Sequence, residues 1–90
     1  MTDEDKQLVD YIEKLESTFA TEGWKSLVKD LESDLDSKRE EMTYGLTSEG
    51  YYKRVGIIET LRKVINFPLF IENLRKAFEE KQNTALNDLP

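Results

Sequence analysis

The chain contains no cysteine and no histidine among its 90 residues. It therefore cannot form a disulfide framework, a zinc site with cysteine or histidine ligands, or a catalytic pair built on a thiolate or an imidazole. A carboxylate pair could still act as acid and base, but only in a pocket that shifts one pKa, for which a thin helical domain has little room. We expect no metal, no cofactor, no catalytic residue and no enzymatic activity.

Long apolar runs are missing as well. The most apolar window, residues 64–71, contains Asn66 and Pro68 and is far shorter than the ~20 residues that span a bilayer. The first residues, Met-Thr-Asp-Glu-Asp, lack the apolar region of a signal peptide. We expect a soluble, intracellular protein that is neither secreted nor transmembrane.

Charge is plentiful and unevenly distributed. Basic residues number 13 and acidic residues 19, for a net charge of -6. Residues 1–49 carry 6 basic and 14 acidic groups, net -8, whereas residues 50–90 carry 7 and 5, net +2. The overall acidity disfavours direct binding to nucleic acid or anionic membranes. The uneven distribution favours a chain that folds back on itself or meets a partner head to tail.

Strand signals are weak, because only 4 glycines and 2 prolines punctuate the chain and apolar residues recur every three or four positions rather than every two. This spacing predicts an all-α fold, an antiparallel hairpin or small bundle of three to four helices without a sheet. We expect a single domain over residues 1–81 and a flexible tail over residues 82–90. The helices are expected at residues 3–20, 23–42, 48–66 and 68–81.

Threonines precede the expected helices. Thr2, Thr21 and either Thr47 or Ser48 are suitable N-caps, because a hydroxyl can accept a hydrogen bond from a backbone N–H of the first turn. Gly23 falls where the apolar phase shifts between the first two helices, which predicts a break or a sharp bend there.

Two residues interrupt the second half of the chain. Pro68 disfavours helical geometry at Phe67, yet the apolar spacing continues across it, so either a new helix or a kinked one fits; we favour a new start or a hard kink. Gly56 inside the third helix costs about 1 kcal/mol relative to alanine. We expect the ring of Trp24 or a helix backbone to lie over it.

The first apolar stripe is the main candidate for partner binding. If the first helix projects from the bundle, this stripe is a seam for self-association or for docking of another protein. A lone domain of this size is only marginally stable, which also favours a homo-oligomer. The stripe consists of Leu8, Ile12, Leu15 and Phe19.

Acidic residues of the second helix suggest an alternative. A carboxylate face can mimic the phosphates of nucleic acid and block an enzyme that binds it, although interspersed lysines and arginines weaken such a field. A solvated helix face, with Asp34 pairing to Lys38 four residues on, is the simpler interpretation. The candidate face comprises Asp30, Asp34, Asp36, Glu40 and Glu41.

Three basic doublets occupy the second half: Lys53-Arg54, Arg62-Lys63 and Arg75-Lys76. They could contact a phosphate backbone, or they could compensate the acidic first half. The overall acidity favours the second interpretation.

Two segments carry a family resemblance, Phe-Ala-Thr-Glu-Gly-Trp-Lys at residues 19–25 and Tyr-Tyr-Lys-Arg-Val-Gly-Ile-Ile at residues 51–58. A Gly-Trp helix start and a later aromatic-x-basic-x-Gly helix resemble small, largely uncharacterised helical accessory proteins of tailed bacteriophages, over residues 8 to about 80. The resemblance implies structural roles for Trp24 and Gly56 and transfers no catalytic residue. It implies a virion-associated or assembly protein that acts by docking or oligomerisation, located in the virion or the cytoplasm of the infected host. A host-takeover factor that inhibits a host enzyme is the alternative.

Overall fold

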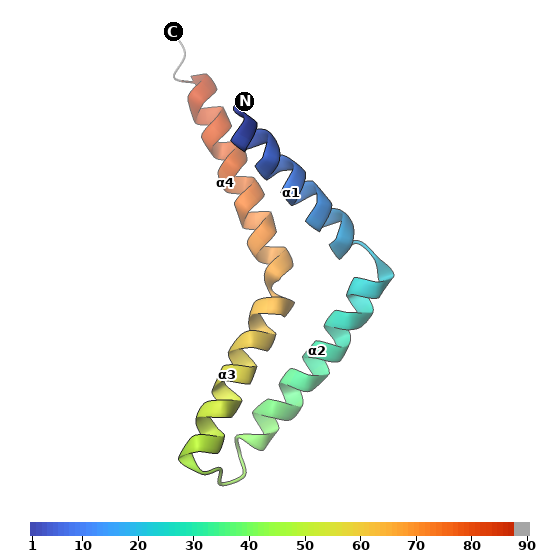
Figure 1. Cartoon of the computed structure of the whole chain (residues 1–90), viewed down its shortest axis with the longest axis vertical. Helices are drawn as coiled ribbons and strands as arrows, with labels where there is room; N and C mark the ends of the chain where they lie inside the picture. Colours follow the sequence, from blue (N-terminus) through green and yellow to red (C-terminus); the bar gives the residue numbers. More distant parts are fainter. Residues whose placement is uncertain (88–90) are drawn as a thin grey trace. The chain divides into compact units, whose positions relative to one another are not determined.

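The computed structural model describes residues 1–87 of the chain, with side chains for residues 1–85. This part of the chain forms four helices and no strand (Figure 1). They are α1 (Asp3–Phe19), α2 (Glu22–Glu41), α3 (Ser48–Ile65) and α4 (Phe67–Asn87). The all-α prediction is confirmed, and the first three helices begin and end within one residue of their expected positions, which is the usual uncertainty of a helix end.

The helices are arranged as two compact units rather than the single domain expected over residues 1–81. Unit 1 comprises Met1–Phe19 and Pro68–Pro90, and unit 2 comprises Ala20–Phe67. Within unit 1, α1 lies antiparallel to α4, and within unit 2, α2 lies antiparallel to α3 (Figure 1). The chain leaves unit 1 after α1 and returns to it with α4, so each unit contains one helix from each half of the sequence.

Threonine caps begin three of the helices, as the sequence predicts. The Asp5 N–H donates to Thr2 Oγ1 over 3.1 Å, while the Thr2 N–H donates to Asp5 Oδ2 over 3.1 Å, in the reciprocal arrangement of a capping box. Thr21 Oγ1 accepts from the Trp24 N–H over 3.2 Å, and Thr47 Oγ1 accepts from the Gly50 N–H over 3.1 Å. These bonds satisfy amide groups that a helix start leaves without intrahelical partners.

The chain breaks between α3 and α4 instead of kinking within one long helix. Asn66 closes α3 with φ -90° and ψ 1°, and its N–H donates to the Arg62 carbonyl over 2.9 Å. A new helix then begins at Phe67, which places Pro68 in its first turn. Proline is tolerated there because first-turn amides have no intrahelical acceptor, so its missing N–H costs nothing. Of the two possibilities that the sequence left open, a new helix and a kinked one, the structure has the new helix.

The prediction of a flexible tail over residues 82–90 is wrong for residues 82–87, which are helical. α4 continues to Asn87, although its end was expected at residue 81. Residues 82–87 contain no glycine or proline, and an established helix extends at little cost through residues that do not break it. Residues 88–90 of the expected tail lie outside the described part of the chain.

The core of each unit is thin. Ile12 and Ile71 are buried in unit 1, with exposed fractions of 1% and 0%, and Leu35 and Ile58 in unit 2, with 8% each. Two paired helices cover only the narrow stripe where they touch, so apolar residues beside that stripe stay partly accessible to solvent.

Candidate functional site

The stripe proposed for docking forms the inner face of α1. Ile12 is 1% exposed, and Leu8, Leu15 and Phe19 are half-buried in the same unit. The stripe was expected to serve as a docking seam only if α1 projects, and this condition is not met at Ile12, which a partner cannot reach while α1 is paired with α4. The physical reason is that α4 supplies the complementary stripe around Ile71, so the apolar spacing of α1 is satisfied within the chain.

An ion pair joins α1 to α4 beside this core. Arg75 Nε donates to Glu16 Oε2 over 2.8 Å, and Arg75 Nη2 donates to Glu16 Oε1 over 2.5 Å. The hydrogen bonds from Arg75 lower the pKa of the Glu16 carboxyl below its ordinary value. The two parallel bonds fix the register of the two helices, because a bidentate contact tolerates little sliding.

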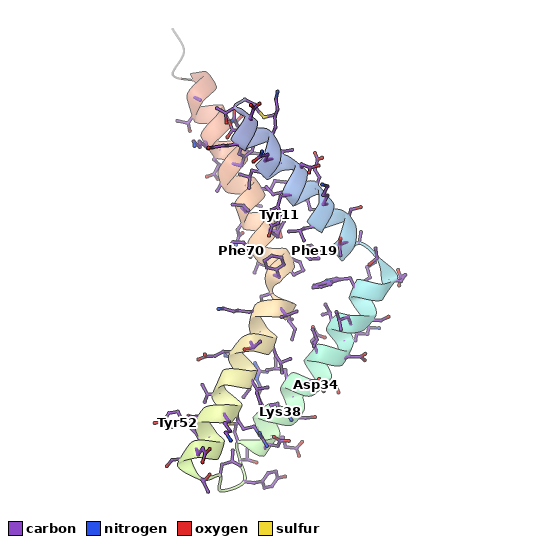
Figure 2. The ribbon with its side chains drawn as sticks, in the orientation of Figure 1. Tyr11, Phe19, Asp34, Lys38, Tyr52 and Phe70 are labelled. Carbon is purple, nitrogen blue, oxygen red and sulfur yellow. The ribbon has the colours of Figure 1, made fainter. Side chains whose placement is uncertain are left out.

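A second ion pair joins α2 to α3. Arg54 Nε pairs with Glu41 Oε2, and Lys38 Nζ lies 3.5 Å from the other oxygen of the same carboxylate. The expected pair between Asp34 and Lys38, both on α2 (Figure 2), is not formed among the described residues, because Lys38 pairs with Glu41 instead.

These contacts bear on the basic doublets. In two of the three doublets the arginine crosses to an acidic residue of the first half, Arg54 to Glu41 and Arg75 to Glu16. The lysine beside it pairs within its own helix, at 3.2 Å for Lys53 and Glu49 and 3.1 Å for Lys76 and Glu72. This arrangement fits the interpretation that these doublets compensate the acidic half.

The five candidate acidic residues do not form one face. At about 100° of helical rotation per residue, three of them follow one flank of α2 and the other two lie on a different flank. Glu41 is already paired, and Asp36 lies 4.0 Å from Arg39. The first flank carries Asp30, Asp34 and Glu41, and the second carries Asp36 and Glu40.

Gly56 and Trp24 do not meet as expected. A β-carbon added at Gly56 would have no heavy atom within 4 Å, so neither a ring nor a backbone lies over it. Gly56 is exposed on α3, whereas Trp24 is half-buried at the start of α2. The close approach inferred from a glycine inside a helix is wrong, and packing does not require glycine at this position.

One side of unit 2 carries a shallow groove. Its lining combines three apolar side chains with two arginines and one glutamate, and its volume is about 320 Å³. The lining residues are Arg39, Met42, Val55, Ile58, Glu59 and Arg62.

The opposite side of unit 2, which bears the Glu41–Arg54 ion pair, carries an apolar surface that the sequence alone did not identify. Three of its side chains are well exposed, Leu27 at 45%, Ile57 at 37% and Val64 at 38%. Leu27 falls outside the apolar stripe that begins at Trp24, and this position was the feature of the sequence that could have indicated a second apolar surface on α2. We call this surface the unit 2 flank; it comprises Leu27, Leu31, Ile57, Leu61 and Val64.

Helical spacing places these residues on one side. On α2, Leu27, Leu31 and Glu41 fall within about 80° of the helix circumference at 100° per residue; on α3, Arg54, Ile57, Leu61 and Val64 step by three, four and three. Steps of three, four and seven return to the same face of a helix. Because Glu41 and Arg54 are paired, both rows lie on the same side of unit 2.

Unit 1 also exposes large apolar side chains. Tyr11 on α1 is 48% exposed, and Leu69 and Phe70 at the start of α4 are 55% and 57% exposed. Both units therefore present apolar side chains that their own helix pair does not cover.

Among residues whose positions the structure describes, no three histidine, cysteine, aspartate or glutamate side chains are grouped so as to hold a metal ion. None of the described helices is both long and apolar enough to span a membrane. Comparison with protein-family models, with curated protein sequences and with solved structures finds no match to this chain.

Proposed function

We propose that the chain is a non-enzymatic helical module that acts by binding other protein chains through the exposed apolar sides of its helix pairs. The observation that carries this proposal is the exposure of Leu27, Ile57 and Leu69, each more than a third accessible, on units in each of which two of the described side chains are buried. Exposed apolar area gathered on one side of an element favours association.

The phage setting rests on the resemblance of residues 19–25 and 51–58 and stays a prediction. A virion-associated or assembly role agrees with a module that works by docking. Inhibition of a host enzyme through the acidic face is less well supported, because the acidic residues occupy two flanks of α2 and are mixed with paired lysines and arginines.

Capture tests the proposal. The intact chain and a variant with Leu27→Gln, Ile57→Gln and Leu69→Gln are immobilised, and each is exposed to labelled intact chain and to bacterial extract. We expect the intact chain to retain protein that the variant does not, because the variant keeps the buried residues of both units. Equal retention by the two, with equal helix content by circular dichroism, would contradict the proposal.

A further inference from the structure

We propose that the unit 2 flank binds a second copy of the chain, so that two α2–α3 pairs form a four-helix arrangement in which α2 of one copy packs on α3 of the other. This inference rests on the proposed function and names the partner of one of its surfaces.

The first reason is the distribution of apolar residues. On this side Leu27 and Leu31 of α2 lie toward the same end of the antiparallel pair as Leu61 and Val64 of α3, and Ile57 continues the row. An α2–α3 pair with an apolar side is half of a four-helix bundle, whose helices each bury a stripe against two neighbours. A second identical pair supplies the missing half.

The second reason is charge complementarity. α2 carries 4 basic and 7 acidic residues, net -3, and α3 carries 4 and 2, net +2. The charges beside the unit 2 flank follow the same division: Asp30, Asp34 and Glu41 on α2, with Lys38 among them, and Lys53 and Arg54 on α3, with Glu49 beside them. Glu41 pairs with Arg54 and Lys38, and Lys53 pairs with Glu49, which leaves a net charge of -2 along the α2 edge and +1 along the α3 edge. This surface is therefore acidic along one edge and basic along the other.

These edges select one of two possible dimers. If two copies of the pair stack face to face about a two-fold axis parallel to the helices, α2 of each copy lies over α3 of the other, and acidic edges meet basic ones. If the axis is perpendicular to the helices, α2 lies over α2 and like charges meet. Opposite charges across an interface set orientation and suppress the wrong pairing, so the first arrangement is the one we assign.

The first measurement is molar mass in solution by light scattering. The intact chain should give about twice its 10.5 kDa, and the Ile57→Glu, Val64→Glu variant should show a two-fold drop in mass with its helix content retained. Tyr52→Glu is the matched control, because Tyr52 lies on the same helix, is 72% exposed and points away from α2 (Figure 2). This control should keep the mass of the intact chain.

Cross-linking tests the pairing with nearly intact chains, so it does not depend on whether a glutamate variant folds. Because the chain has no cysteine, Leu27→Cys and Val64→Cys chains each carry a single thiol. A short thiol-reactive linker should join the two variants when they are mixed, at several times the yield seen with either variant alone. Cross-linking within the Leu27→Cys sample alone would indicate α2 on α2 and overturn the assignment.

A monomer at every concentration would overturn the inference. If that monomer still retains a different protein in the capture experiment, the proposed function stands and only the self-association fails. If it retains nothing, both fail.

Discussion

At the scale of single residues, burial and conformation separate positions that look alike in the sequence. Gly45 has a φ of 27°, in the region that disfavours side chains, whereas Gly56 lies inside α3 with open space around it. Glycine inside a helix loses backbone freedom on folding and contributes no side chain to compensate. The two glycines should therefore respond in opposite ways to alanine.

We predict that Gly56→Ala raises the free energy of unfolding by about 1 kcal/mol, because alanine favours the helix and meets no neighbouring atom. Urea denaturation followed by circular dichroism measures the change. Gly45→Ala is the control and should lower stability, since alanine there is strained. A loss of stability in Gly56→Ala would show that this position has a packing role that the structure does not reveal.

At the scale of helices, each unit has a buried apolar residue on both of its helices and, among the described residues, an ion pair that joins the two helices. In unit 1 the Glu16–Arg75 pair joins α1 to α4, and in unit 2 the Glu41–Arg54 pair joins α2 to α3. Both pairs use an acidic residue from the first half of the sequence and an arginine from the second. The opposite charges of the two halves therefore act inside each unit, where they favour the observed pairing of helices.

The Glu16–Arg75 pair predicts a pH dependence. Hydrogen bonds from Arg75 lower the folded-state pKa of Glu16, so its contribution to stability is fully present above the unfolded-state pKa. That contribution is lost as the pH falls through the lowered folded-state pKa, because the protonated carboxyl no longer pairs with the guanidinium.

We therefore expect Glu16→Gln to be less stable than the intact chain near neutral pH and equally stable in acid below the lowered pKa. Urea titrations at a series of pH values measure the difference. Glu13→Gln, which removes an exposed carboxylate from the same helix, should show a smaller and flatter difference. A Glu16→Gln difference that is constant with pH would rule out the ion pair as its cause.

At the scale of the whole molecule, the chain forms two units. It passes from unit 1 to unit 2 after α1 and returns to unit 1 with α4. Their cores are separate, with Ile12 and Ile71 in one and Leu35 and Ile58 in the other. Compact cooperative units of a protein can open separately from one another.

We predict that Ile71→Ala, which removes a fully buried side chain at a cost of about 2–5 kcal/mol, strips amide-exchange protection from α1 and α4 while α2 and α3 keep theirs. Leu69→Ala is the control, because Leu69 lies on the same helix at 55% exposure and should leave the protection nearly unchanged. Equal loss over all four helices would show that the units unfold together.

Much of the secondary structure follows from local chemistry and was therefore predictable. Threonine hydroxyls cap helix starts, Pro68 disfavours a straight continuous helix, and apolar spacing sets the inner face of α1. These effects act over a few residues, so the sequence carries them directly. The end of α4 was misjudged because residues 82–87 lack an apolar pattern but also lack any residue that stops a helix.

The sequence by itself determined an all-helical chain, the positions at which its helices are interrupted, and the opposite charges of its halves. Only the tertiary structure decided which helices pair, and hence that Ile12 is interior, that Gly56 is open, and that Leu27, Ile57 and Val64 remain accessible. The reason is that periodicity defines the apolar face of each helix but not the neighbour that covers it. A side chain beside the contact stripe is buried or exposed according to how many helices surround it, and here each has one partner within its unit.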